Sequence, residues 1–533
     1  MPEPRKPSNV SFLRNRARFR LLGLTVDDMI RLFFGGNAVV SVVVLGLITI
    51  FLFKEGHSFF GDNRRNLETY RRAGLEYVDY MRQQERDHTA LIRWLSDVRV
   101  RQLRELTEVQ GMDLAAANAA LAPFDDFAGS FSDTVEDLRG LVSDLTDVAS
   151  ATKTQFLVNE DKRVQKQQLL AEGLTEQAEQ VQIDPVDFVA AAEVLTGTLP
   201  YYRELAAAFE EALRAVVAEI PAAVAPGQQP RLDRFTQLVA DYIAGFPAVE
   251  QRLSTWDPNI PVGFGEAITA FVFGRQWLTA SFWQDWYGIV PLFTGSLLVA
   301  FIALVIAVPM GVCSAIYINQ IARPAEQRIV KPCIEFISAI PSVVLGFFGI
   351  AVLGQTLRAL SQFESLAWIP GFPFSERLNA LTAGCLLALI ATPTIFTLAE
   401  DAINNVPRAF KEASLALGAT RLQTIVRIVM PASLSGVISA VLLGLGRVIG
   451  ETMVVLLCAG NRIQIPDFTK GLAIVTEPVH TMTGIVAQEM GEVVRGSIHY
   501  RALFCVGIVL FFLSLLINYV AQKVVRRYKL PGS

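Results

Sequence analysis

Cysteine and histidine are both scarce in this chain of 533 residues, which contains five cysteines and four histidines. All five cysteines lie in or beside apolar stretches, and the polar stretch from 57 to 255 has none, which excludes a disulfide framework there. No two cysteines or histidines have the spacing of metal ligands, so we expect no metal site. A Gly-x4-Gly-Lys-Ser/Thr loop is also missing, and we therefore do not expect this chain to hydrolyse ATP itself.

Charged residues make up only 18% of the chain, whereas hydrophobic residues make up 52%. This composition is too apolar for a typical soluble protein and too charged for one that lies wholly in a membrane, so it predicts a mixed architecture. A helix needs about 20 apolar residues to cross a hydrocarbon core of about 30 Å. Six stretches are long enough: 32–53, 289–318, 333–354, 380–399, 432–459 and 502–521.

The distribution of lysine and arginine orients these spans. Basic residues gather in the two tails and in the short loops at 319–331 and 400–431, whereas the loops near 355–379 and 460–501 are less basic. The positive-inside rule therefore places both termini and the 400–431 loop in the cytoplasm. An even number of spans agrees with this orientation. The first span begins too late, and lacks a small-residue cleavage site, to be a removable signal peptide.

The polar stretch from 57 to 255 lies between the first two spans, so the same topology places it outside the cytoplasm. It holds 32 acidic and 20 basic residues, a net charge of −12, which leaves +8 for the rest of the chain. Its apolar residues recur at helical spacing, as in Leu91, Trp94, Leu95 and Val98. We predict an all-helical bundle with long hairpins.

Proline marks the expected breaks in this bundle, at Pro123, Pro185, Pro200 and the stretch 221–230. The stretch admits two interpretations. It is either a structural cap with a solvated acidic surface, or a docking or sensing platform for an extracytoplasmic partner. An acidic helical surface alone names no ligand.

A polar, helix-forming segment stands on the predicted cytoplasmic side between two apolar spans. It reads Glu412-Ala-Ser-Leu-Ala-Leu-Gly418 and is followed after nine residues by Ile428-Val-Met-Pro431. Pro407 suits the first turn of a new helix, and Gly418 permits a bend between two helices. An ordinary amphipathic helix at the membrane surface is the alternative. The common register of the glutamate, glycine, isoleucine and proline favours a segment that a cytoplasmic partner holds.

Two charged residues, Arg447 and Glu451, lie inside the fifth span. A charge at the bilayer centre costs about 2.5–3.5 kcal/mol on insertion scales, so such residues face a bundle interior or an aqueous path. Four residues apart on one helical face, the two side chains can form an ion pair that stabilises the bundle. Alternatively, Arg447 offers its fork of donors to a passing oxyanion, and Glu451 sets its orientation or gates the path.

Several of these motifs resemble a known family. The segment from Glu412 to Pro431 resembles the EAA signature of ABC-importer permeases, with Ser414 in place of the third residue and Met430 in place of a leucine. Gly446-Arg-Val-Ile-Gly-Glu-Thr-Met-Val-Val455 is similar to permeases of phosphate-specific ABC transporters of the PstC type, as is Ile340-Pro-Ser-Val-Val-Leu-Gly-Phe-Phe-Gly349. The sister PstA type usually has alanine-proline where this chain has Met453 and Val454. The resemblance is weak over 20–60 and good over 265–525.

This resemblance implies an all-α, polytopic membrane protein with about six transmembrane helices, built on a type I ABC importer permease core. The helical extracytoplasmic insertion, predicted above from the residues, exceeds the usual pattern of this family. It assigns coupling to an ATPase to Glu412, Ala413, Gly418, Ile428 and Pro431. It assigns the substrate pathway to Arg447, Glu451 and Thr452. No catalytic residue is expected, because the chain is a transport subunit and not an enzyme.

The resemblance also implies partners and a location. We expect a second homologous permease subunit, a dimer of ATP-binding subunits, an extracytoplasmic phosphate-binding protein, phosphate and the lipid bilayer, but no nucleic acid. No cofactor is expected on this chain, since the partner subunit hydrolyses ATP. The expected location is the bacterial plasma (inner) membrane. The alternatives are a permease for another oxyanion (molybdate, sulfate or phosphonate) and a membrane sensor with an extracytoplasmic helical domain.

The expected division of the chain follows from these assignments. The chain is expected to comprise, in this order, a basic cytoplasmic tail, a first transmembrane helix, the insertion, an amphipathic connection, the permease core with its 400–431 coupling loop, and a second cytoplasmic tail. Their ranges are 1–31, 32–56, 57–255, 256–288, 289–525 and 526–533.

Overall fold

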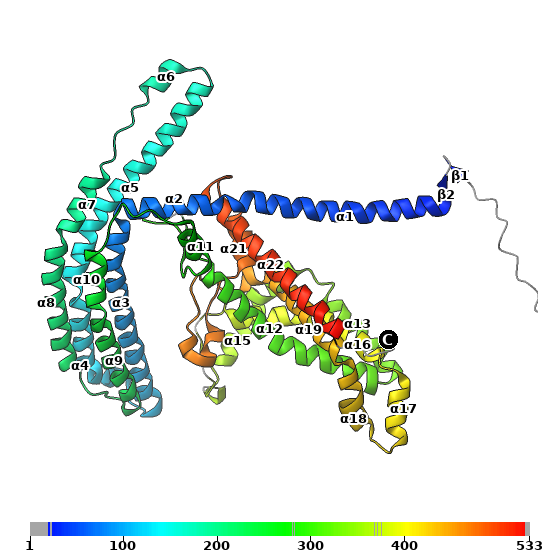
Figure 1. Cartoon of the computed structure of the whole chain (residues 1–533). Helices are drawn as coiled ribbons and strands as arrows, with labels where there is room; N and C mark the ends of the chain where they lie inside the picture. The colour runs from blue at the N-terminus through cyan, green and yellow to red at the C-terminus, as the bar shows by residue number, and fades with distance from the viewer. Residues whose placement is uncertain are drawn as a thin grey trace, which may run out of the picture. The chain divides into compact units, whose positions relative to one another are not determined.

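The computed structural model describes residues 20–21, 24–279, 281, 283–366, 368–369, 371–374 and 376–527. The chain forms two compact units. The first, here called the membrane unit, comprises Met1–Phe59 and Pro291–Ser533, and the second, the insertion unit, comprises Phe60–Val290. Helices make up nearly all of the described secondary structure in both units (Figure 1). The predicted all-α fold class is therefore confirmed.

The first described residues of the membrane unit form a short hairpin of β1 (Arg20–Leu21) and β2 (Leu24–Thr25), paired antiparallel. Its α-helices are α1 Val26–His57, α12 Val290–Ile316, α13 Pro324–Ile337, α14 Ser342–Phe348, α15 Gly354–Ser361, α16 Ala380–Asn404, α17 Arg408–Ala416, α18 Arg421–Thr424, α19 Met430–Gly450, α20 Met453–Cys458, α21 Met482–Glu489 and α22 Ile498–Arg527. Short π or 3-10 turns extend them, namely η3 Tyr317–Ile321, η4 Gly349–Leu353, η5 Glu364–Leu366, η6 Ile425–Val429 and η7 Phe468–Thr476.

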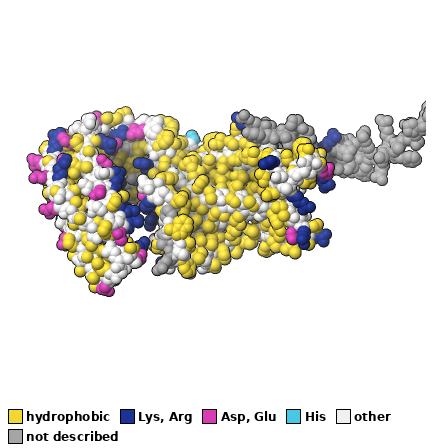
Figure 2. Space-filling view, turned by 90° about the horizontal axis from the view of Figure 1, so that it is seen from below, with side chains coloured by type: hydrophobic (Ala, Val, Ile, Leu, Met, Phe, Trp, Pro, Cys, Tyr) yellow, Lys and Arg dark blue, Asp and Glu magenta, His cyan; other side chains and the backbone are white. Residues whose placement is uncertain are grey.

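Six helical stretches in the described part of the chain are long and apolar enough to cross a membrane, as predicted. They are Phe33–Arg72, Val290–Ile321, Ser342–Ser361, Ala380–Asn404, Arg421–Gly450 and Ile498–Val524. In Figure 2, the visible face of the membrane unit is covered almost throughout by hydrophobic side chains. Such a broad apolar surface is stable in lipid and not in water.

The third span lies further along the chain than predicted. The sequence favoured a helix over 333–354, but α13 ends at Ile337 and the span runs over Ser342–Ser361. A break before Pro341 is expected, because the proline ring disfavours the helical region for the residue that precedes it. Pro341 itself has an extended ψ of 134° and caps the start of α14. The preceding α13 is amphipathic, and its Lys331 pairs with Glu400 at the end of α16, at 2.9 Å.

The centre of the membrane unit is α16, which packs mainly against α19, while α1 packs against α22. Two thirds of the apolar part of α16 is buried, against none of the apolar part of α1. Small residues allow the close approach of the central helices. A Cβ added at Gly311 or Gly444 would lie 2.9 Å or 2.6 Å from the side chain of Ile395 in α16. The core is thus closely fitted around this helix.

The insertion unit is a helical bundle with one small hairpin, β3 (Trp277–Leu278) paired antiparallel with β4 (Trp286–Tyr287). Its helices are α2 Phe59–Arg72, α3 Leu75–Arg104, α4 Leu114–Asp133, α5 Glu136–Ala171, α6 Thr175–Gln180, α7 Phe188–Gly197, α8 Leu199–Ala218, α9 Gln229–Ala244, α10 Phe246–Ser254 and α11 Phe264–Val272, with short turns η1 Glu105–Val109 and η2 Pro226–Gln228. The long α5 and the short α6 form a hairpin that extends beyond the other helices of this unit (Figure 1).

One of the expected breaks in this unit is wrong. Pro123 lies inside α4, where the side chains of Phe124, Phe127 and Phe131 enter the core. Burial of these rings outweighs the loss of one backbone hydrogen bond at the proline. Pro200, in contrast, stands in the first turn of α8, as predicted.

The insertion unit extends beyond the predicted end of the insertion at 255. The Asn63 amide donates to the carbonyl of Ala267 at 3.2 Å, and Arg71 pairs with Glu266 at 2.7 Å. The buried amine of Lys153 donates to the carbonyl of Trp283 at 2.6 Å. The segment expected to be a connection, 256–288, is therefore part of the same compact unit, which ends at Val290.

Histidine 88 lies at the centre of this bundle. His88 is fully buried, with its ring stacked on Phe131 at 4.7 Å and its Nε2 3.2 Å from the hydroxyl of Thr134. Its Nδ1 has no hydrogen-bond partner among the described residues. Burial disfavours the charged imidazolium and lowers the pKa of His88 to about 4. His88 is thus a packing residue of the bundle core.

Candidate functional site

The segment between α16 and α19 forms a helical hairpin, here called the coupling hairpin and defined as α17, Gly418 and α18. Val406 is 3% exposed and anchors the start of the hairpin in the core beneath it. Pro407 follows with φ −56° and ψ 134°, and α17 begins at Arg408. The prediction that Pro407 starts a new helix is confirmed, because its fixed φ suits this position and its missing N–H leaves no donor unpaired.

Gly418 makes the turn between the two helices. Its φ of +84° lies in the left-handed region, which a residue with a Cβ enters only at a cost. Thr420 then begins α18 with a capping box, in which its backbone N–H donates to Gln423 and its hydroxyl accepts from the backbone N–H of Gln423. The bend that the sequence placed at Gly418 is therefore present.

Ser414 closes the hairpin. Its hydroxyl lies 3.0 Å from that of Thr424, so one hydrogen bond joins α17 to the end of α18. Ser414 is also one of the two residues that depart from the EAA signature, which has alanine at this position. Sequence reasoning missed this contact, although a serine and a threonine on either side of a glycine turn were visible in the chain.

The coupling hairpin exposes apolar side chains as well as charge. Leu417 is 89% and Leu422 is 68% exposed, and Phe410 is also exposed. Glu412 and Ala413 are exposed on α17, whereas Ile428 is half-buried and Pro431 is exposed in the first turn of α19. Apolar residues exposed together on a polar hairpin are typical of a surface that a partner protein covers.

Arg447 stands in the last turn of α19, on the exposed surface of the isolated chain. Its Nη1 donates to the hydroxyl of Thr394 in α16 at 3.2 Å. Thr394 was not among the predicted site residues. The signal was available, because Thr392-Pro-Thr394 is the most polar point of an apolar span.

Glu451 lies outside the helix that carries Arg447. Helix α19 ends at Gly450, and Glu451 has an extended conformation with φ −74° and ψ 130°. Its carboxylate accepts from the backbone N–H of Met453 at 3.3 Å, and its carbonyl accepts from the hydroxyl of Thr483 at 3.0 Å. Thr452 is half-buried between α19 and α20.

Two predictions about this span are therefore wrong. The fifth span is not one helix over 432–459, and Arg447 and Glu451 do not share a helical face, because α19 stops between them. Among the described residues, Arg447 contacts Thr394 and Glu451 contacts the start of α20, with no ion pair between the two. An ion pair at helical spacing requires both residues on one continuous helix.

Glu451 instead lines a small, partly open cavity of about 10 Å³. Hydroxyl groups of Ser296, Thr481 and Thr483 line the same cavity, together with apolar residues. That volume holds about one water molecule. Irregular backbone at membrane depth is tolerated where it is buried in protein or lines such a cavity, and the break at Glu451 meets this condition.

Comparison with known proteins gives concordant results. Residues 307–530 match the family described as binding-protein-dependent transport system inner membrane component. The chain is 34% identical over 242 residues to the probable ABC transporter permease protein YqgH of Bacillus subtilis, which covers 44% of this chain and 72% of that protein. It is 28% identical over 281 residues to the phosphate transport system permease protein PstC of Pasteurella multocida, covering 51% of this chain and 83% of that protein.

A solved structure is also similar, an inward-facing conformation of the MetNI methionine ABC transporter. It is 20% identical, with a TM-score of 0.33, and the match covers 46% of this chain and 95% of that chain. The match to the family model includes the coupling hairpin, Thr394 and Arg447. With six membrane-spanning helices and these sequence relatives, the chain belongs to the family of binding-protein-dependent transport system inner membrane components, as a permease subunit of the PstC type.

Proposed function

We propose that this chain forms half of the phosphate pathway of an ATP-driven importer, and that its coupling hairpin receives the motion of a separate ATPase subunit. The observation that carries the proposal is Arg447, a cation within a membrane span whose hydrogen bond goes to a neutral hydroxyl, that of Thr394. A guanidinium has five N–H donors, and a single hydroxyl uses one of them. The others can form a bidentate contact with an oxyanion.

Burial of a charge in a bilayer is unfavourable unless the charge serves a path or a partner. Thr394 does not neutralise Arg447, so the guanidinium keeps its positive charge for an anion that passes. Phosphate is the anion that the names of several relatives give for their own transport systems. Molybdate, sulfate and phosphonate remain alternatives, because the guanidinium fork suits each of them.

The coupling hairpin is continuous in the chain with the two helices that carry Thr394 and Arg447. Helix α16 carries Thr394 and ends just before α17, and α19 carries Arg447 and follows α18 and η6. With 1.5 Å per residue, Thr394 lies about 15 Å from the end of α16, and Arg447 about 26 Å from the start of α19. A push on the coupling hairpin therefore acts on the two helices that hold the pathway.

Glu412, Ala413 and Gly418 form the surface that the ATPase subunit would hold, together with the exposed Leu417. Ile428 and Pro431 link this surface to α19. When two ATPase subunits close on ATP, they would draw the coupling hairpins of two permeases together and shift the balance between inward-facing and outward-facing states. This shift occurs only if the ATPase subunits, in a given nucleotide state, bind one conformation of the permeases more tightly than the other.

The remaining partners and the orientation follow from the same proposal. A second, homologous permease completes the pathway, and a phosphate-binding protein delivers the anion from outside. Both termini and the coupling hairpin face the cytoplasm, and the insertion unit lies outside, in accord with the basic tails and the acidic insertion. ATP binds to the partner subunit, and this chain needs no cofactor.

Replacing Arg447 tests the pathway role. Uptake of radiolabelled phosphate is measured in membrane vesicles that contain the assembled transporter. Arg447→Gln should abolish this uptake, whereas Arg447→Lys should retain part of it because lysine keeps the charge but not the planar fork. Co-purification of the ATPase and second permease controls for assembly. Normal uptake by the glutamine variant would refute the pathway role.

The identity of the anion needs a separate experiment. ATPase activity of the reconstituted complex is measured with phosphate, molybdate, sulfate or a phosphonate in the presence of the binding protein. We expect stimulation by phosphate alone. If one of the other anions stimulates the ATPase activity and phosphate does not, that anion is the cargo, and the proposed coupling scheme still holds.

A further inference from the structure

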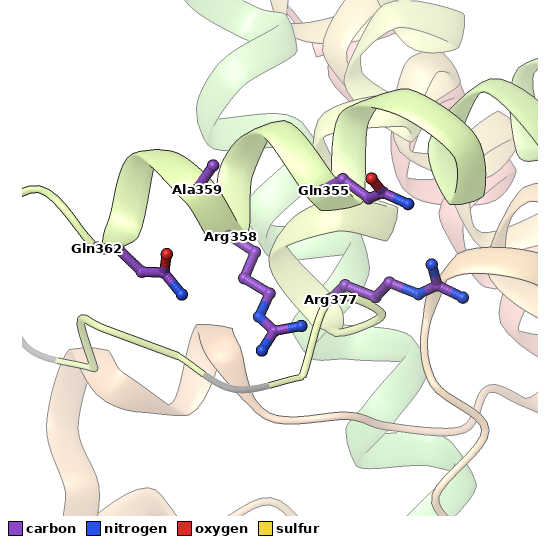
Figure 3. Close-up of a pocket in the computed structure, with 5 residues that line it drawn as sticks. All are labelled: Gln355, Arg358, Ala359, Gln362 and Arg377. Carbon is purple, nitrogen blue, oxygen red and sulfur yellow. The ribbon is translucent and has the colours of Figure 1, made fainter.

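A second group of basic residues lies at one end of the membrane unit, around a cavity of about 380 Å³. Figure 3 shows the residues that line it: Gln355, Arg358 and Ala359 from α15, Gln362 directly after this helix, and Arg377 from the loop that leads into α16. The side chain of Arg358 extends from the helix toward the loop that carries Arg377 (Figure 3). All five side chains are exposed at the surface of the chain.

The polar groups that line this cavity are two guanidinium groups and two carboxamides, and the stems of these side chains and one methyl group complete the lining. Two guanidinium groups supply ten N–H donors and two carboxamides supply four more. None of the described residues that line it is acidic. Within the described part of the chain, neither Arg358 nor Arg377 forms an ion pair with a carboxylate, unlike nearby Lys470, which pairs with Glu477 at 2.5 Å. A cavity with this chemistry attracts an anion and repels a cation.

The backbone around the cavity is held in place. The hydroxyl of Ser361 donates to the carbonyl of Arg358 at 2.7 Å and accepts from the backbone N–H of Phe374 at 3.4 Å, which joins α15 to the loop. The carbonyl of Arg377 accepts from the hydroxyl of Thr382 at 3.0 Å. The two arginines are therefore attached to a frame that is fixed by hydrogen bonds on both sides.

Gly354 brings the two walls of the cavity together. A Cβ at this position would lie 2.7 Å from the carbonyl oxygen of Arg377, closer than van der Waals contact allows. Only glycine thus lets the loop approach the start of α15 this closely. The close approach places Arg377 opposite the face of α15 that carries Arg358.

The cavity and the coupling hairpin lie at opposite ends of one helix. Arg377 precedes α16 by three residues, and α17 begins four residues after α16 ends at Asn404. The 25 residues of α16 span about 37 Å, the thickness of a bilayer with part of its headgroups. Because the coupling hairpin faces the cytoplasm in the proposed function, the cavity opens on the extracytoplasmic side.

We propose that Arg358 and Arg377 form a receiving site for a tetrahedral oxyanion at the extracytoplasmic mouth of the permease. The anion would pass from this site to Arg447, which lies beside Thr394, about 21 Å further along α16. The identity of the anion as phosphate rests on the proposed function, whereas the site itself rests on the cavity and its donors. At this volume, the anion enters with part of its hydration shell, so the site raises the local anion concentration.

Chemical modification in the assembled transporter tests the site directly. Phenylglyoxal modifies arginine, and mass spectrometry reports the extent at each residue. We expect millimolar phosphate to slow the modification of Arg358 and Arg377, and chloride at equal ionic strength to have no such effect. Arg462, which is exposed and lies outside the cavity lining, serves as the control whose modification phosphate does not change.

The outcomes of this experiment separate the two proposals. Protection by sulfate or molybdate but not by phosphate would support an oxyanion site and overturn phosphate as the cargo. Absence of protection by any oxyanion would overturn the site. If the binding protein protects the arginines equally well in the presence and in the absence of the anion, the site is also overturned. The arginines would then hold carboxylates of a docked protein.

Transport of the double variants provides a second measurement. With saturating phosphate-loaded binding protein, Arg358→Gln/Arg377→Gln should lower the uptake rate about tenfold, the loss expected for one charge-assisted contact. Arg462→Gln should leave the rate unchanged. Arg358→Lys/Arg377→Lys should recover only part of the rate. An unchanged rate in the glutamine variant, in a complex whose wild type takes up phosphate, would overturn the receiving site but not the proposed function.

Discussion

The two units of this chain solve the problem of a stable core in different ways. The membrane unit carries 26 basic and 16 acidic residues, and the insertion unit carries 21 basic and 35 acidic residues. Around α16 the core consists largely of alanine, glycine and aliphatic residues, whereas the insertion core is rich in buried rings such as Tyr77, Phe131 and Tyr202.

This difference has a physical origin in the solvent of each unit. Lipid provides no hydrophobic force between helices, so the membrane helices gain stability from close contact, which small residues permit. Water drives large rings into the core of the insertion unit. Interfaces of small residues can slide or rotate, whereas interlocked rings resist such motion. The membrane unit is thus suited to conformational change, and the insertion unit to rigidity.

The largest expected effect is in the insertion core. Phe131→Ala should lower the free energy of unfolding of the insertion unit by about 3–5 kcal/mol, because the ring is fully buried and packs on Phe235 at 5.1 Å. The measurement is urea unfolding of the fragment 60–290, which has its own core. The control is Leu157→Ala, at a residue that is 48% exposed, which should change the free energy of unfolding by less than about 0.5 kcal/mol. Equal effects would contradict the buried-ring core.

A pH titration of the same fragment tests the polar centre of that core. The folded state lowers the pKa of His88 from 6.5 to about 4, chiefly by burial, with a further lowering by Arg139 and a partial offset from Phe131. The unfolded state therefore binds more protons between these values, and stability is fully present above pH 6.5. It should fall by about 3 kcal/mol as the pH decreases to 4.

The fragment contains only this histidine, so His88→Phe isolates its contribution. The phenylalanine variant should show a smaller decrease in stability between pH 6.5 and 4, with the remaining slope coming from carboxylates. Identical pH profiles for the two proteins would show that His88 titrates normally in the fold.

Close packing in the membrane unit is tested by two neighbouring glycines. Gly444→Val should lower the stability of the assembled transporter by about 1–3 kcal/mol, because a Cβ there would lie 2.6 Å from Ile395. Gly446→Val should have a smaller effect, since the nearest atom, in Ile517, is 3.9 Å away. Thermal unfolding in detergent measures both. A larger effect at Gly446 would argue against the fit around α16.

The smallest expected effect is at the coupling hairpin. Ser414→Ala removes the hydrogen bond to Thr424 and should cost about 1 kcal/mol of local stability. Hydrogen exchange of α17 and α18 in the assembled transporter measures it, and faster exchange confined to these helices is expected. Ser435→Ala in α19 is the control, and it should leave the exchange of α17 and α18 unchanged. Unchanged exchange in the Ser414 variant would show that the partner subunit alone holds the hairpin.

Much of the fold could be predicted because its signals are local. Runs of apolar residues revealed six spans, Pro407 marked the start of a helix, and Gly418 marked a turn. The Glu412 segment indicated the family, and membership in it leaves the membrane-sensor alternative without support. These signals depend on residues close together in the chain, so one sequence is enough to read them.

What could not be predicted depends on contacts between distant segments. The partner of Arg447 is Thr394, 53 residues earlier, and the cavity at Arg358 depends on a loop that returns beside α15. The break at Glu451 was missed because no proline marks it. Pro123 misled in the opposite direction, since packing of the neighbouring phenylalanines keeps α4 continuous. The roles of Arg447, Glu451 and Thr452 stay predictions.

The break at Glu451 also has a mechanical consequence. A single helix through the bilayer would act as a stiff rod, so a tilt at its cytoplasmic end would appear in full at the other end. Here Glu451, which has an extended backbone, and Thr452 join α19 to α20 outside either helix, and such a joint can bend where a continuous helix cannot. In the proposed transporter, the half of the span that is joined to the coupling hairpin would then turn while the half beyond Thr452 stays in place. The two ends of the pathway would therefore open and close separately.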